Sequence, residues 1–112
     1  MPPKEVLKYI LDIESVVEEL DEVVKIHSKD YHKFSSNFMA VRTVERDLEI
    51  IGEAVRKLLE IDPTLNISSS KQIIGLRNMI VHAYDSIDPT VLWRILLKDI
   101  PILKEEIKEI KK

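Results

Sequence analysis

The stretch VLKYILDIESVVEELDEVV, residues 6–24, decides the fold class. Its apolar side chains recur at alternating spacings of four and three residues, at Val6, Ile10, Ile13, Val17, Leu20 and Val24. This period lines them up along one stripe of an amphipathic helix, which must pack against another helix. We therefore expect a long first helix over about residues 3–26.

The same helical period recurs further along the chain. A second long helix is indicated by Val41, Val44, Leu48, Ile51, Val55 and Leu58, and it should end before Asp62-Pro63 because proline restricts the residue before it. Between the two, Ser28 is a candidate cap for a short helix through Phe34. A third long helix should start at a cap among residues 68–70, all serines, and run to about Tyr84.

Asp88-Pro89 is a start signal for the last helix, a capping side chain followed by proline at the first helical position. Pro101 lies inside this helix, so the sequence predicts a kink there. No segment alternates with period two for long enough to predict a strand. We expect one all-α domain over residues 1–112, a bundle of four main helices and one short helix.

Composition limits the chemistry. The chain has no cysteine, which excludes disulfides, thiolate metal sites and a thiol nucleophile. No apolar run is long enough to cross a bilayer and no signal peptide opens the chain, so a cytoplasmic protein is expected.

The net charge is −3, and residues 1–34 hold five lysines against eight acidic residues. Any RNA is therefore expected to approach away from this first helix.

The run Arg77-Asn78-Met79-Ile80-Val81-His82-Ala83-Tyr84 carries the most chemistry. Arginine offers a planar, permanently charged fork to a phosphate, and histidine can give or take a proton near pH 7. On an ideal helix Arg77 points towards the apolar side and His82 lies about 140° away, too far round for a tight pair. Either the helix loosens near His82, or two copies of the motif meet in a dimer.

Other polar residues are placed to assist. Asn78 lies between Arg77 and His82 on the helix and can hydrogen-bond in a cleft. On the second long helix, one face carries Arg42, Arg46, Glu49 and Glu53. These form either a set of weak surface ion pairs or the wall of a cleft, with Arg46 touching phosphate and Glu53 orienting Arg77 or His82.

These motifs resemble the HEPN superfamily, and in particular its HepT toxin branch. The spacing of the arginine, histidine and tyrosine matches the HEPN motif. Three further segments match the HepT pattern in order and spacing: Asp47 to Ala54, Gly75 to Asn78, and Asp99-Ile100-Pro101. The resemblance implies an HEPN-type bundle that forms a homodimer, with paired motif helices building a composite cleft. Gly75 would then allow the two backbones to approach closely.

The resemblance also implies a function, an RNA endonuclease toxin of a type VII-like toxin–antitoxin system. His82 would act as general base or acid and Arg77 would stabilise the phosphate, with no metal or cofactor and with products ending in 2′,3′-cyclic phosphate. Tyr84 would accept AMP from a partner MNT-type nucleotidyltransferase antitoxin, which would silence the cleft. The alternatives are a non-catalytic HEPN module that binds nucleotide or a partner, and a purely structural helical dimer.

Overall fold

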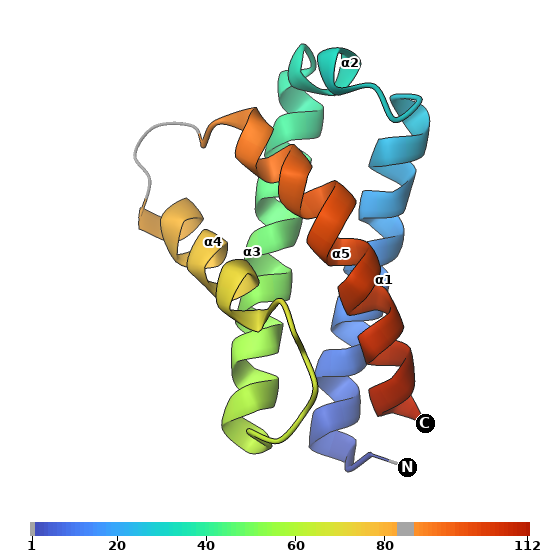
Figure 1. The fold of residues 1–112 in the computed structure, drawn as a ribbon, viewed down its shortest axis with the longest axis vertical. Helices are drawn as coiled ribbons and strands as arrows, with labels where there is room; N and C mark the ends of the chain where they lie inside the picture. The colour runs from blue at the N-terminus through green and yellow to red at the C-terminus, as the bar shows by residue number, and fades with distance from the viewer. Residues whose placement is uncertain (1, 83–86) are drawn as a thin grey trace.

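The computed structural model describes residues 2–82 and 87–112, and the described residues form helices with no strand between them. The helices are α1 (Lys4–Ile26), α2 (Tyr31–Ser35), α3 (Phe38–Ile61), α4 (Ser70–His82) and α5 (Pro89–Lys111). Four are long and α2 is short, so the prediction of an all-α bundle is confirmed. In Figure 1, α1, α3 and α5 form the body of the bundle, and α4 lies across one side of α3.

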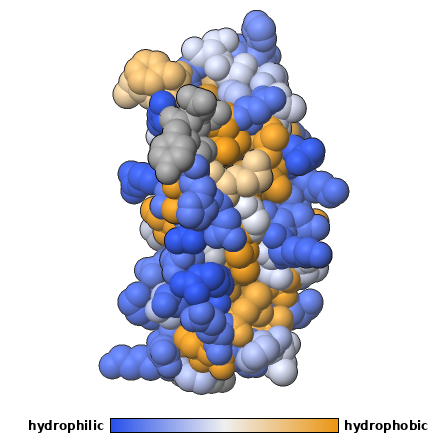
Figure 2. Space-filling view, turned by 90° about the vertical axis from the view of Figure 1, so that its left-hand side faces the viewer, coloured by the Kyte–Doolittle hydropathy of each residue, from blue (hydrophilic) through white to orange (hydrophobic). Residues whose placement is uncertain are grey.

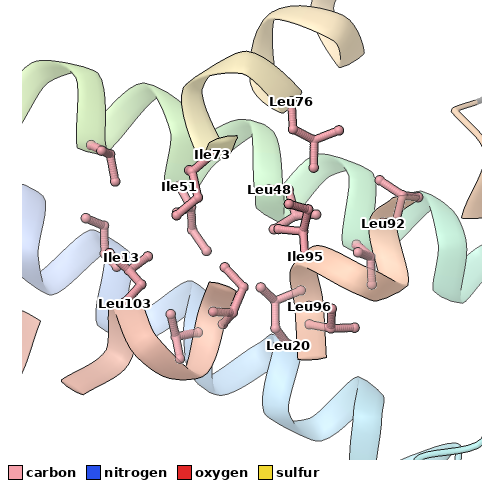
Figure 3. Close-up of a cluster of buried hydrophobic side chains, with 14 of the residues drawn as sticks. Ile13, Leu20, Leu48, Ile51, Ile73, Leu76, Leu92, Ile95, Leu96 and Leu103 are labelled. Carbon is pink, nitrogen blue, oxygen red and sulfur yellow. The ribbon is translucent and has the colours of Figure 1, made fainter. Parts of the chain in front are cut away.

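The apolar stripes predicted from the sequence meet in one core. Side chains of all four long helices interdigitate there, as Figure 3 shows, and the labelled set is Ile13, Leu20, Leu48, Ile51, Ile73, Leu76, Leu92, Ile95, Leu96 and Leu103. Phe34 of α2 is fully buried and stacks on Trp93 of α5, with ring centroids 4.8 Å apart. This stack closes the end of the bundle where α2 lies.

Helix ends follow local capping chemistry, with one correction. The predicted cap at Ser28 is wrong: Asp30 caps α2 by accepting a hydrogen bond from the Lys33 backbone N–H at 3.2 Å. Ser28 has φ 55° and its N–H bonds back to Lys25, so it belongs to the turn that ends α1. Asp88 caps α5 by accepting from the Thr90 N–H at 2.9 Å, as predicted.

The start of α4 is tied to α5. The Ser69 hydroxyl donates to the buried Asp99 carboxylate at 2.9 Å, and the Ser68 N–H donates to the Glu106 carboxylate at 3.0 Å. Asp99 is one of the residues that carry the sequence resemblance. Its bond to Ser69 fixes where α4, the helix that carries Arg77, begins. Pro101, the predicted site of a kink, lies exposed within α5, which continues to Lys111.

Two apolar side chains of α4 are exposed to solvent. Only Ile73 and Leu76 of this helix are buried, whereas Met79 is 53% and Val81 42% exposed. The apolar residues of α4 thus wrap around the helix and do not form a single stripe, and α4 packs mainly on α3. The face of the molecule on the α4 side shows apolar surface between polar side chains (Figure 2).

Candidate functional site

Arg77 is the centre of the candidate site, and α3 fixes its position. Its guanidinium Nη2 lies 2.9 Å from the Glu53 carboxylate, and its Nη1 donates to the Asn78 side-chain oxygen at 3.1 Å. The side chain is 25% exposed, and its Nε is buried without a hydrogen-bond partner among the described residues. The sequence predicted a guanidinium near the core that needs an anionic partner, and Glu53 is that partner.

The close approach of α3 and α4 depends on Gly52. A methyl group added there would lie 2.3 Å from Arg77 Cβ and 2.8 Å from Arg77 Cγ, far inside van der Waals contact. The stem of Arg77 therefore lies directly against the α3 backbone. Gly75, by contrast, has no neighbouring atom of the described residues within 4 Å of such a methyl group, so none of these residues requires glycine at this position.

Glu53 is held from its other side by Arg56. One carboxylate oxygen accepts from Arg56 Nη2 at 2.6 Å while the other faces Arg77, and Arg56 Nη1 reaches Glu60 at 2.6 Å. The hydrogen bond and charge of Arg56, with smaller contributions from Arg77 and Lys57, lower the pKa of Glu53 against the opposing effect of burial. Glu53 therefore stays ionised and keeps the Arg77 fork fixed.

A cleft of about 390 Å³ opens beside this pair. It is lined from three helices, by Tyr9 and Asp12 of α1, Arg46, Glu49, Ile50, Glu53 and Ala54 of α3, and Arg77 of α4. Four of the residues predicted to form a cleft, Arg46, Glu49, Glu53 and Arg77, thus meet in one. Asn78 joins them through its bond to Arg77.

The remaining predicted residues are placed differently. His82 is exposed at the end of the described part of α4, and it does not line the cleft. Tyr84, the predicted AMP acceptor, lies outside the described residues. Arg42 is exposed and its guanidinium lies 3.7 Å from the buried Glu45 carboxylate, so Arg42 pairs within α3 and does not line the cleft.

The sequence did not predict a place in the site for Tyr9, Asp12 or Arg56. Arg56 follows Glu53 by three residues, a spacing that places them on the same helix face, and this signal could have revealed the pair. Tyr9 and Asp12 carry no such signal, because their place in the cleft depends on how α1 packs against α3.

Asp47 is a second unusual carboxylate in the segment that carries the resemblance. It is 1% exposed, and neither oxygen has a hydrogen-bond partner among the described residues. Burial and the neighbouring Glu19 carboxyl raise the pKa of Asp47 to about 7, opposed by the charge of Arg46. The residue does not line the cleft.

Comparison with known proteins identifies the family. The HepT-like model, described as ribonuclease HepT-like, matches residues 6–110. The chain belongs to the HepT-like ribonuclease family, within the HEPN superfamily. It is 35% identical to "Putative RNase MJ1380" of Methanocaldococcus jannaschii, over 96% of this chain and 98% of the relative.

Two further relatives come from other organisms. "Putative RNase TTE0752" of Caldanaerobacter subterraneus is 30% identical over 88% of this chain and 89% of its own length. "Probable ribonuclease HepT" of Thermococcus cleftensis is 29% identical over 93% of this chain and 94% of its own length. No solved structure is significantly similar to the chain.

Within 2–82 and 87–112, no group of three or more histidine, cysteine or acidic side chains is arranged to hold a metal ion. None of the helices in these ranges is long and apolar enough to span a membrane.

Proposed function

We propose that this HepT-like chain is a metal-independent endoribonuclease that cuts RNA in the cleft beside Arg77. The observation that carries the proposal is the Glu53–Arg77 pair at the wall of a cleft that also contains Arg46. A guanidinium held by a carboxylate has a fixed orientation, and its fork suits a phosphate. Family membership supports RNA as the substrate.

RNA supplies its own nucleophile in this reaction. The 2′-oxygen gives its proton to a general base and attacks the adjacent phosphorus, while the bond from phosphorus to the 5′-oxygen breaks and that oxygen takes a proton. The products end in a 2′,3′-cyclic phosphate and a 5′-hydroxyl. His82 serves one of the two proton transfers, and Arg77 stabilises the charge that grows on the phosphate oxygens.

The site is proposed to be shared between two copies. His82 lies outside the cleft that holds Arg77, so His82 of a second copy can complete it. The exposed Met79, one turn along from the open space at Gly75, supports this side of α4 as the contact face, because an apolar side chain can be buried there and a backbone can approach closely.

Substitution tests the chemistry. Arg77→Ala and His82→Ala should each reduce cleavage of a short RNA by roughly 100-fold or more, and Arg77→Lys should restore little. Arg94→Ala and His32→Ala are matched controls, because both residues are exposed and neither lines the cleft. EDTA should have no effect. Activity that is lost with EDTA and restored by a divalent ion would refute the metal-independent mechanism.

Mixing the two inactive variants tests the shared site. A dimer of one Arg77→Ala chain and one His82→Ala chain keeps one composite site that has both side chains. Random mixing should therefore restore about a quarter of the wild-type activity, whereas sites within one chain would stay inactive. A monomeric mass in light scattering, together with full cleavage activity, would also exclude the composite site.

We further propose that the chain is the toxin of a two-component system, with cytoplasmic location. A partner nucleotidyltransferase would transfer AMP to Tyr84 and so block the binding of substrate phosphate. The second candidate function is a non-catalytic module that binds RNA or nucleotide in the same cleft. This second function would be favoured if wild type and His82→Ala bound RNA with equal affinity and neither cut it.

A further inference from the structure

Tyr9 forms the α1 wall of the cleft whose opposite wall holds Arg77. Its ring is half-buried, packing against the hydrophobic core while it lines the 390 Å³ space. The cleft therefore has two chemically different sides. The α4 side presents a guanidinium, and the α1 side presents an aromatic ring and the carboxylate of Asp12.

The charges near Tyr9 differ from those of the rest of α1. Residues 1–11 hold two lysines and one glutamate, whereas residues 12–22 hold six acidic residues and no basic residue. Lys8 lies 4.6 Å from the centre of the Tyr9 ring and 3.6 Å from the Asp12 carboxylate. The end of α1 that reaches the cleft thus carries Lys8 beside Tyr9, and Asp12 is the member of the acidic run that lines the described cleft.

An aromatic ring beside an acceptor carboxylate suits a nucleobase better than a phosphate. A base offers a flat apolar face for stacking and N–H groups for hydrogen bonds, whereas a phosphate would be repelled by Asp12. We propose that Tyr9 stacks on a base of the same RNA molecule whose phosphate Arg77 binds. This proposal rests on the ribonuclease function proposed above. Tyr9 is then a positioning residue of the substrate site, and α1 takes part in RNA binding.

The test uses steady-state cleavage of a short RNA by the full chain. Tyr9→Leu keeps an apolar side chain against the core but removes the aromatic face, and Tyr9→Phe keeps the face and removes only the hydroxyl. Stacking of one base on an aromatic side chain supports roughly a 5- to 150-fold gain in affinity. Tyr9→Leu should therefore raise KM about tenfold with little change in kcat, and Tyr9→Phe should behave as wild type.

Tyr31→Leu is the matched control, because Tyr31 is also half-buried but contacts Thr90 and Trp93 away from the cleft. An unchanged KM in Tyr9→Leu would overturn the proposal. An equal loss in Tyr9→Phe and Tyr9→Leu would overturn it as well, because it would assign the effect to the hydroxyl.

A binding experiment separates this inference from the proposed nuclease. A 2′-O-methyl RNA containing 2-aminopurine cannot be cut, and the fluorescence of that base is quenched when it stacks. Wild type and Tyr9→Phe should quench it and Tyr9→Leu should not, even if no RNA is cleaved. Binding without Tyr9-dependent quenching would refute stacking while leaving cleavage in place. If Tyr9→Leu fails to fold, the wild type alone still tests the proposal, because bound RNA whose 2-aminopurine is not quenched would refute stacking.

Discussion

Gly52→Ala should destabilise the fold and disturb the site together, because Gly52 is where α3 touches the stem of Arg77. The added methyl carbon would lie 2.3 Å from Arg77 Cβ and 3.2 Å from the Ile73 carbonyl oxygen. Carbon atoms normally pack at about 3.5–4.0 Å, so α3 and α4 must separate by more than 1 Å at this crossing.

The net cost follows from two opposing effects. Overpacking a close contact costs about 1–3 kcal/mol, whereas replacing a helical glycine by alanine gains about 0.5–1 kcal/mol. We expect the free energy of unfolding to fall by about 1–2 kcal/mol, which lowers the melting temperature by roughly 4–8 °C for a chain of this size. Arg77 should also move away from Glu53, so RNA cleavage should fall at temperatures where the variant is folded.

Gly75→Ala is the matched control. No atom of residues 2–82 and 87–112 lies close to its added methyl group, so in a single chain the substitution should gain about 0.5–1 kcal/mol. Both variants should be unfolded in urea at one fixed protein concentration, since dimerisation makes stability depend on concentration. A Gly52→Ala chain as stable as wild type, with full activity, would refute the close approach of α3 to Arg77.

Further predictions concern pH, modification and assembly. Because the pKa of Asp47 is raised to about 7 in the folded chain, the native state holds this proton more tightly than the unfolded one, so stability should fall as pH rises from about 4 to 7. In urea unfolding, Asp47→Asn should be more stable than the wild type at pH 8, and the gain in stability should be smaller at pH 5. Equal gains at the two pH values would refute the titration of Asp47 in this range. Intact-mass spectrometry after incubation with ATP, Mg²⁺ and the partner nucleotidyltransferase should show AMP on the wild type and none on Tyr84→Phe. The variant should still cut RNA. Full modification of Tyr84→Phe would show that the acceptor is another residue. Gly75→Arg should give a folded monomer in light scattering and lose cleavage, because the space beside this position is open within the described part of the chain. An intact dimer would move the interface away from this part of α4.

The fold could be predicted because its main signals are local. The stripes of α1 and α3, the Asp88-Pro89 start and the stop before Asp62-Pro63 each depend on a few neighbouring residues. The cap at Ser28 was wrong because serine and aspartate are both good caps, and only the left-handed turn at Ser28 and Lys29 decides between them.

The site could be predicted only in part. The need of Arg77 for an anionic partner followed from its direction on the helix, and Glu53 was among the residues proposed for that role. Tyr9 and Asp12 could not be found, because their contribution depends on the register between α1 and α3, which no local pattern encodes. The exposure of Met79 and Val81 was also missed, since an average apolar direction does not show how widely the apolar residues spread.

The way α4 is attached has a consequence for dynamics. It buries only two side chains and packs mainly on α3, while its first turn is held by Ser69 and Asp99. Detaching α4 therefore exposes less apolar surface than unfolding the whole bundle, and its amide hydrogens should exchange with solvent faster than those of α1 and α3. If a second copy covers the outer face of α4, exchange there should slow as protein concentration rises. The helix that carries Arg77 and His82 would then become rigid only in the assembled protein, which would link catalytic competence to the amount of chain present in the cell.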